Sequence, residues 1–306
     1  MSPPILELVR VSRQFAGRTV VQALDLAVAR GEVLGLLGVN GAGKTTAMRM
    51  MAGALAPDAG HVRLGGRDLA QHPQLARRQV GYLPETPPLH AELTTVEYLR
   101  FCARLHGVAR GAVTAAVERA IERCQLGEVR GRVIGVLSKG WRQRIGIAQA
   151  IVHAPDLIVL DEPASGLDPV QALGLRALVR ELGRAHAVVL STHLLPDVAA
   201  CCDRVAILHQ GRLRHTGPTA VGGGTHLRLG TRAPLTAQTL TSLTPVATAA
   251  PLDVLHWRVG LRPGSDAADL AAALVGHGVA VTELRADEPP LEAIFIAIAS
   301  GEALAA

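Results

Sequence analysis

Short apolar runs bounded by Gly, Pro or Asp alternate with helical patterns from residue 5 to about residue 215. In runs such as Leu157–Leu160 and Ala187–Ser191 there is no polar alternation, which is typical of strands covered on both faces of a parallel sheet. Helical patterns follow several of these runs, so the sequence predicts an α/β core. The predicted strands of this core are Ile5–Val11, Val33–Leu37, Val80–Leu83, Leu157–Leu160, Ala187–Ser191 and Val205–His209.

The pattern changes twice along the chain. Between about residues 87 and 154 it is almost entirely helical, which predicts an α-helical insertion in the first domain, residues 1–217. The sequence GPTAVGGGT is then typical of a linker, placed at residues 218–225. Residues 226–306 are predicted to form a small α+β accessory domain. Its predicted elements are strands His226–Leu229, Val254–Val259 and Val279–Leu284 and helices Asp266–His277 and Leu291–Ala299.

Length and composition agree with two soluble domains. The 306 residues suit about two domains, and the 49% of hydrophobic residues can build a sizeable core. No stretch approaches the roughly 18–20 apolar residues of a membrane span, and the first residues lack the layout of a signal peptide. We therefore expect a soluble, cytoplasmic protein. The net charge of +5 is spread along the chain and distinguishes neither a membrane surface nor nucleic acid as a partner.

Cysteine and lysine usage adds one observation each. The four cysteines show no CxxC spacing, which favours reduced, buried thiols over a metal site or a disulfide framework. Positive charge is nearly all Arg, and the two lysines, Lys44 and Lys139, both fall inside the motifs described next. These positions fit sites that need a compact ammonium group in place of a planar guanidinium.

The first chemical motif is GVNGAGKTT, which directly follows the predicted strand Val33–Leu37 and opens a helical pattern. It matches G-x-x-x-x-G-K-[ST], the phosphate-binding P-loop, whose backbone N–H groups surround phosphates at a helix N-terminus. Lys44 would reach the β- and γ-phosphates, and the Thr45 hydroxyl would bind Mg²⁺. The alternative is a plain glycine-rich turn; a dinucleotide-binding G-x-G-x-x-G motif is excluded, because it would require Gly at Thr46. The predicted nucleotide-binding residues of this segment are Gly38, Asn40, Gly41, Ala42, Gly43, Lys44, Thr45 and Thr46.

The second motif is LIVLDEP, a buried strand that ends in two carboxylates. Asp161 lies at the carboxyl end of a strand, where α/β sheets bind ligands, and would hold Mg²⁺ through water. Glu162 could orient or deprotonate the attacking water as general base. Adjacent carboxylates are common in ordinary loops, so this motif takes its weight from the P-loop upstream.

With both motifs in place, the chain resembles the ATP-hydrolysing subunits of ABC transporters over residues 5 to about 217. The resemblance implies that Phe15, in SRQFAG, stacks on adenine. His193, in STH, would be the switch histidine that contacts the γ-phosphate. SGLDP matches the D-loop and would place Asp168 at a dimer seam, while VLSKGWRQR resembles the LSGGQ signature. In that segment Ser138, Lys139 and Gly140 would face the nucleotide held by a second copy.

Two positions depart from the family pattern. The signature has Lys139 and Trp141 where the family has Gly and Gln, so Lys139 either adds positive charge near the site or faces solvent. GYLPETPPL matches the Q-loop, but Glu85 stands where Gln is expected, and a carboxylate cannot donate a hydrogen bond as an amide does. Glu85 could still face Mg²⁺ or water. Both variants resemble the subgroup that serves ABC-2-type membrane subunits, which implies export.

The resemblance implies a P-loop NTPase fold with an antiparallel β subdomain and the helical insertion. It also implies hydrolysis of ATP with Mg²⁺ as cofactor, a multispanning membrane permease as partner, a second copy in a nucleotide-sandwich dimer, and a place on the inner face of the cell membrane. The sequence contains no patch of basic and aromatic residues that would predict nucleic-acid binding. The alternatives are a non-transport ABC ATPase acting on DNA or the ribosome, and an ATP-dependent regulatory protein whose C-terminal domain binds a small ligand.

Overall fold

The computed structural model describes residues 3–219, 226–262, 264–286 and 291–300. Contacts divide the chain into one unit of Met1–Thr219 with Ala297–Ala306 and a second of Ala220–Ile296. The central sheet of the first unit contains β3 (Val33–Leu37), β6 (Val80–Leu83), β7 (Leu157–Leu160), β8 (Ala187–Thr192), β9 (Arg204–His209) and β10 (Arg212–Pro218).

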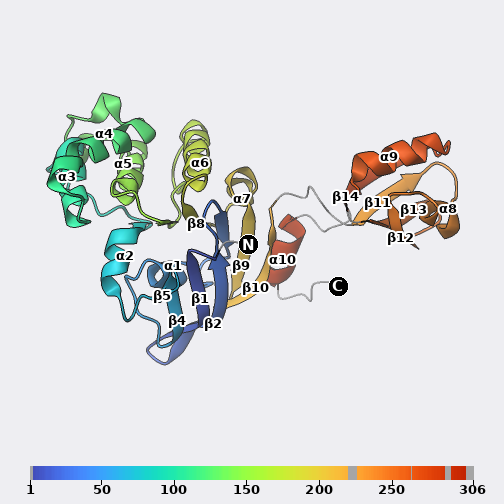
Figure 1. Ribbon diagram of the computed structural model, residues 1–306, viewed down its shortest axis with the longest axis horizontal. Coiled ribbons are helices and arrows are strands. Elements are labelled where there is room, and N and C mark those ends of the chain that lie inside the picture. The colour runs from blue at the N-terminus through green and yellow to red at the C-terminus, as the bar shows by residue number, and fades with distance from the viewer. Residues whose placement is uncertain (1–2, 220–225, 263, 287–290, 301–306) are drawn as a thin grey trace. The chain divides into compact units, whose positions relative to one another are not determined.

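This sheet has the order β10-β9-β3-β8-β7-β6 (Figure 1). The five strands from β9 to β6 are parallel, and β10 runs antiparallel to β9. Every residue of β3, β7 and β8 is buried, because helices or the second sheet cover both faces. The predicted α/β core with a mostly parallel sheet is therefore confirmed, and β3, β6 and β7 have the predicted bounds.

A second, antiparallel sheet of the first unit has the order β2-β1-β4-β5. It agrees with the β subdomain that the family resemblance implies, but the apolar runs predicted only part of one of its strands. The predicted strand Ile5–Val11 continues four residues further, to Phe15, and β2 alternates between buried and exposed residues. The strands are β1 (Leu6–Phe15), β2 (Arg18–Val28), β4 (Ala59–Leu64) and β5 (Arg67–Asp68).

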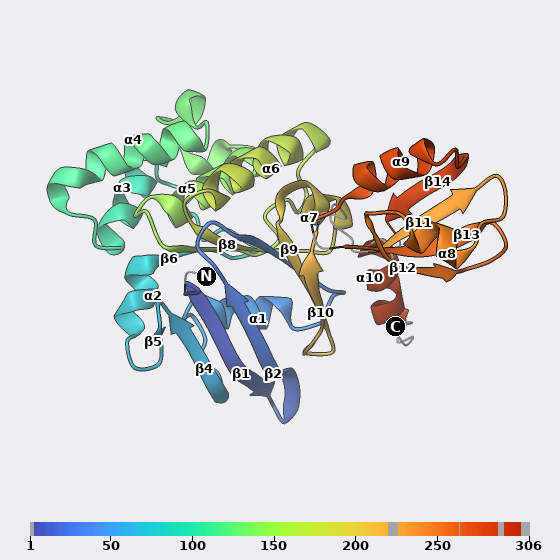
Figure 2. The same ribbon diagram turned by 45° about the vertical axis from the view of Figure 1, so that its right-hand side comes forward.

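Helices hold the two sheets together. One hydrophobic core joins Leu24 of β2, Met48 of α1 (Lys44–Met51) and Leu34 of β3, so α1 lies between the sheets. Figure 2 shows α1 on one side of the central sheet and α6 (Pro169–Gly183) on the other. The remaining core helices are α2 (Pro73–Gln79) beside β6 and α7 (Leu195–Cys201) beside β3.

Every described element between residues 87 and 154 is helical, as predicted. The main helices are α3 (Thr95–Leu105), α4 (Val113–Arg123) and α5 (Lys139–Ile151), which Figure 1 shows gathered together. Helix α3 begins with a capping box, in which Thr94 and Glu97 bond each other's backbone N–H groups. Short 3₁₀ turns at Arg110–Ala112, Gly127–Val129 and Ile134–Val136 connect these helices.

Two stacked histidines join this helical insertion to the core. The rings of His106, after α3, and His153, after α5, are parallel within 7° with centroids 4.0 Å apart. His106 donates from Nδ1 to the carbonyl of Arg77 at 2.7 Å, and His153 donates from Nε2 to the carbonyl of Val80 at 3.2 Å. Burial, with a smaller effect of His106, lowers the pKa of His153 to about 4.

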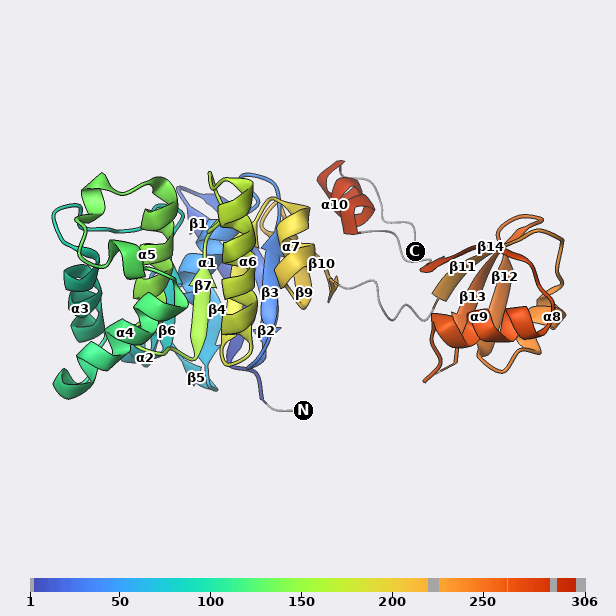
Figure 3. The ribbon, with the colours of Figure 1, turned by 90° about the horizontal axis from the view of Figure 1, so that it is seen from above.

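The second unit is a small α+β domain, as predicted, with the sheet order β12-β13-β11-β14. Its chain order is the β-α-β-β-α-β arrangement, with all neighbouring strands antiparallel. Leu229 and Trp257 share one face of the sheet with Leu240 and Leu270 of the two helices, and Figure 3 shows α9 along this sheet. The elements are β11 (His226–Thr231), α8 (Ala237–Thr241), β12 (Val246–Pro251), β13 (His256–Leu261), α9 (Ala267–Gly276) and β14 (Val281–Ala286).

Some predicted boundaries need correction. Strand β10 extends to Pro218, which had been assigned to the linker; proline is tolerated there because β10 is an edge strand. Residues 220–225 of the predicted linker lie outside the described residues. The predicted strand Val254–Val259 begins only at His256, since Asp253 accepts backbone N–H bonds from Leu255 and His256 in a turn. The last described helix is α10 (Leu291–Ser300), one residue longer than predicted.

Two compositional expectations bear on the described chain. All four cysteines are free and buried, as predicted. Among the helices that the structure describes, none combines the length and the apolar character that a membrane crossing requires.

Candidate ATP-binding site

The P-loop connects β3 to α1 and has the geometry that its glycines predict. Gly43 has φ 101°, and a Cβ at this position would lie 2.6 Å from the carbonyl oxygen of Val20, so only glycine fits. Helix α1 begins at Lys44 without a side-chain cap. The backbone N–H groups of its first turn are therefore available to an anion, and the helix dipole favours negative charge there.

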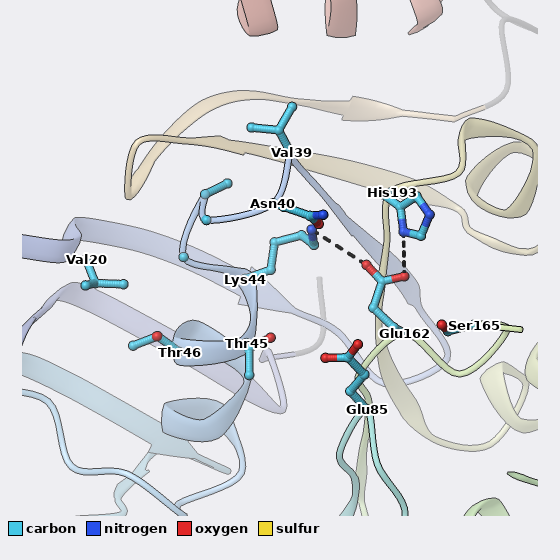
Figure 4. A pocket seen from close by; sticks show the side chains of 13 residues that line it. Val20, Val39, Asn40, Lys44, Thr45, Thr46, Glu85, Glu162, Ser165 and His193 are labelled. Atoms are coloured by element: carbon cyan, nitrogen blue, oxygen red, sulfur yellow. Dashed lines mark hydrogen bonds and ion pairs between the residues drawn. The ribbon is translucent and has the colours of Figure 1, made fainter.

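A pocket of about 420 Å³ opens in front of this loop (Figure 4). Most of the predicted nucleotide-binding residues line it, together with Glu85, Glu162 and His193, which come from segments far apart in the sequence. The residues that line the pocket are Val20, Val39, Asn40, Gly41, Ala42, Gly43, Lys44, Thr45, Thr46, Glu85, Glu162, Ser165 and His193. Gly38 is not among them, but its carbonyl accepts a hydrogen bond from Lys44 Nζ at 2.7 Å.

Three charged or titratable side chains form a line across the pocket. Lys44 Nζ lies 3.6 Å from Oε1 of Glu162, and His193 Nδ1 donates to Oε2 of the same carboxylate at 2.9 Å. Lys44 and Glu162 are largely buried, with 7% and 13% of their side chains exposed, whereas His193 is half exposed. The two predicted catalytic residues, Glu162 and His193, are thus in direct contact in one chain.

A buried serine bonds to both residues of the Asp161–Glu162 pair. Ser191, at the end of β8, donates from Oγ to Oδ1 of Asp161 at 2.6 Å and accepts the backbone N–H of Glu162 at 2.8 Å. Glu162 has φ 47°, a left-handed conformation that is strained for a residue with a side chain. Sequence reasoning missed this role of Ser191; its only signal was its place in the STH motif.

The three residues predicted to hold Mg²⁺ carry oxygen donors that fit this cation; Thr45 and Glu85 line the pocket, whereas Asp161 is not part of its lining. Asp161 is fully buried, and its Oδ2 has no hydrogen-bond partner in the described structure, so a hard cation or its water would satisfy this oxygen. Thr45 and Glu85 line the pocket, and Figure 4 shows the Glu85 carboxylate on the same side as Thr45. These are oxygen ligands, which Mg²⁺ prefers. When bound, the cation would neutralise negative charge on phosphate oxygens.

The predicted signature residues lie apart from this pocket in the same chain. Ser138 and Gly140, at the start of α5, line a separate cavity of about 210 Å³ with Trp141. Asp168 accepts the backbone N–H of Gln171 and caps α6.

The structure does not bring Phe15 to the pocket. Its side chain is 45% exposed at the end of β1, and the Arg13 guanidinium lies 5.0 Å from the ring centroid. Val20 and Ser165, which sequence reasoning did not single out, do line the pocket. Ser165 begins the SGLDP motif, whereas Val20 carries no motif signal and reaches the pocket through the folding of β2.

Known proteins resemble about two thirds of this chain. A family model described as ABC transporter matches residues 21–165. The bacitracin transport ATP-binding protein BcrA of Enterococcus faecalis is 36% identical over 211 residues, which cover 68% of each chain. The Nod factor export ATP-binding protein I of Paraburkholderia xenovorans (strain LB400) is 35% identical over 213 residues, covering 69% of this chain and 70% of that protein.

A solved structure agrees with these relatives. The ATP-binding subunit of an ABC transporter is 33% identical and superposes with a TM-score of 0.64, covering 70% of this chain and 90% of that one. The P-loop pocket, the carboxylate pair at the end of β7 and these relatives lead to one conclusion. The chain belongs to the ABC transporter family, as an ATP-binding subunit that hydrolyses ATP to drive transport.

Proposed function

We propose that this subunit powers export through a separate ABC-2-type membrane permease. The observation that carries the ATP-driven part of the proposal is the line Lys44–Glu162–His193 across the P-loop pocket, where a phosphate-binding lysine lies beside the proposed water-activating groups. The relative named for Nod factor export supports the outward direction, and the relative named for bacitracin transport supports a role in transport. The permease would then choose the substrate.

Two copies would form the working unit. Ser138 and Gly140 line a cavity separate from the P-loop pocket, so they cannot complete that pocket within their own chain as it stands. Head-to-tail packing of two copies would bring each signature segment over the nucleotide of the other. Asp168 would lie at the seam, and Phe15, exposed at the end of β1, would remain free to stack on adenine.

Each side chain then has a distinct role in hydrolysis. Lys44 Nζ contacts the carbonyl of Gly38 and the carboxylate of Glu162, and on nucleotide binding it would contact phosphate oxygens in place of the carboxylate. Glu162, released from Lys44, would accept a proton from the attacking water, and His193 would hold the carboxylate in place. Thr45, Asp161 and Glu85 would hold Mg²⁺, with Asp161 acting through water.

The place of the protein follows from its partner. The permease would hold this subunit on the inner face of the cell membrane. The segment from Glu85 to Arg104, which leads from the pocket into the helical insertion, would carry the ATP cycle to the permease.

The test of the site uses two variants. Glu162→Gln keeps the shape of the side chain but removes the base, so it should bind ATP, accumulate as a dimer and lose turnover by on the order of 10²–10³-fold. Lys44→Ala should lose nucleotide affinity itself. Wild-type turnover by Glu162→Gln, or unchanged binding by Lys44→Ala, contradicts the corresponding role.

The test of export uses the partner. Purification of the tagged subunit from membranes should recover a multispanning protein. Membrane vesicles that contain both proteins should then transport substrate in the export direction when ATP is supplied. Stimulation of the ATPase by DNA or ribosomes, without such a partner, would favour the non-transport alternative. Ligand binding by the second unit that changes ATP turnover would favour the regulatory one.

A further inference from the structure

The two departures from the family pattern meet in one cavity. Glu85 and Lys139 both line a space of about 390 Å³, together with Arg142 and Ser165. Glu85 and Ser165 also line the P-loop pocket, so the two spaces share a wall. A carboxylate and an ammonium have thus replaced two uncharged family residues at positions that face the same cavity of one chain.

Lys139 reaches across this cavity to the loop after β7. It is the first residue of α5 and is exposed, and a Cβ built on Gly166 would lie 2.2 Å from its Nζ. The ammonium therefore lies against the backbone beside Ser165. In the described residues neither Lys139 nor Glu85 is held in an ion pair, so both charges remain available to act on the cavity.

Carboxylates outnumber ammonium groups in the lining of the P-loop pocket. Glu85 and Glu162 line the pocket against a single lysine, Lys44. An ATP molecule adds further negative charge, so a carboxylate in place of the family's amide increases the need for positive charge around the pocket, beyond the Mg²⁺ that Glu85 would help to hold. Lys139 and Arg142 are the positively charged residues that line the adjoining cavity with Glu85, and of the two only Lys139 departs from the family pattern.

We propose that Lys139 and Glu85 form a charge-matched positioning pair within one subunit. Lys139 offsets the Glu85 carboxylate and holds the loop at Ser165 and Gly166, so that the pocket accepts nucleotide although it contains an additional acid. The inference rests on the assignment of the P-loop pocket as the ATP site. It differs from a role of Lys139 toward the second copy alone, because it acts before any dimer forms.

The test is a double-mutant cycle on the full-length chain at a concentration where size-exclusion chromatography shows a monomer. Binding of a fluorescent ADP analogue with Mg²⁺ is measured for Lys139→Met, Glu85→Gln and the double variant. Lys139→Met should weaken binding about three- to tenfold in the natural background and less than about twofold beside Glu85→Gln. Lys139→Arg keeps the charge and should stay within about twofold, and added salt should shrink the effect of Lys139→Met.

Two outcomes overturn the pairing. One is a loss on Lys139→Met that is equal in both backgrounds, which would mean that Lys139 acts only through its contact at Gly166. The other concerns a charge exchange, in which Glu85→Lys is combined with Lys139→Glu. The pairing is overturned if this double variant binds nucleotide more weakly than Glu85→Lys alone and Lys139→Glu alone. Failure of the ATP site itself is distinguished by Lys44→Ala: if that variant binds nucleotide as tightly as the natural chain, the pocket assignment is at fault.

Discussion

Ser191 offers a direct test of how the fold positions Asp161 and Glu162. Its hydroxyl donates to Asp161 Oδ1 and accepts the backbone N–H of Glu162, and the side chain is fully buried. Ser191→Ala removes both bonds without adding bulk. The alanine variant should therefore unfold more easily and also release Glu162 from its left-handed backbone conformation.

The magnitude follows from the two bonds. A hydrogen bond to a charged group contributes about 1.5–3 kcal/mol, and leaving a partly buried N–H without an acceptor costs about 1 kcal/mol. Because both bonds use one side chain, their effects overlap, and we expect the free energy of unfolding to fall by about 3 kcal/mol. Relaxation of Glu162 should move its carboxylate from Lys44 and His193 and lower kcat by at least about tenfold.

The assay can isolate the first unit. The chain has two tryptophans, Trp141 in α5 and Trp257 in β13, so a Trp257→Phe background makes fluorescence report the first unit during urea unfolding. Ser242→Ala, an exposed serine of the second unit, checks that the fluorescence reports the first unit alone and should change the measured stability by less than about 0.5 kcal/mol. Unchanged stability of Ser191→Ala refutes the hydrogen-bond argument; lower stability with unchanged kcat refutes its link to Glu162.

Two further predictions concern the contacts that hold the helical insertion to the core. Because the pKa of His153 is about 4 in the fold and about 6.5 when unfolded, the unfolded chain binds the proton first as pH falls. The stability due to neutral His153 is therefore complete above pH 6.5 and lost toward pH 4, by up to about 3 kcal/mol. In urea unfolding across this pH range, the free energy of unfolding should fall less in His153→Phe than in the natural chain, by that amount. An equal dependence of this free energy on pH in both proteins would contradict the lowered pKa. Gly81→Ala would place a Cβ 1.9 Å from the carbonyl oxygen of Ala150 and should destabilise by about 1–3 kcal/mol or more in the same assay, whereas Gly111→Ala, with no neighbour within 4 Å, should not.

How well each strand could be predicted depended on its environment. Strands β3, β6 and β7 are short, almost wholly buried apolar runs, and the sequence marked their bounds correctly. Strands β2 and β12 alternate or mix buried and exposed residues and contain Arg, Thr or Ala, so their runs were not recognised. A half-exposed strand carries a weaker apolar signal than a covered one, because only one of its faces must avoid water.

The site residues also differ in how well they could be predicted. The sequence by itself determined the P-loop and the DE pair, because each is contiguous and its chemistry follows from neighbouring residues. It also showed that Glu85 and Lys139 depart from the family pattern, but not that the two departures share a cavity.

Only the tertiary structure decided which distant residues meet. It joined Glu162 to Lys44, His193 and Ser191, brought Val20 to the pocket and left Phe15 outside its lining. The physical reason is that parallel strands distant in sequence end at the same sheet edge. The contacts made there depend on register and packing across the whole core, which no local pattern of residues contains.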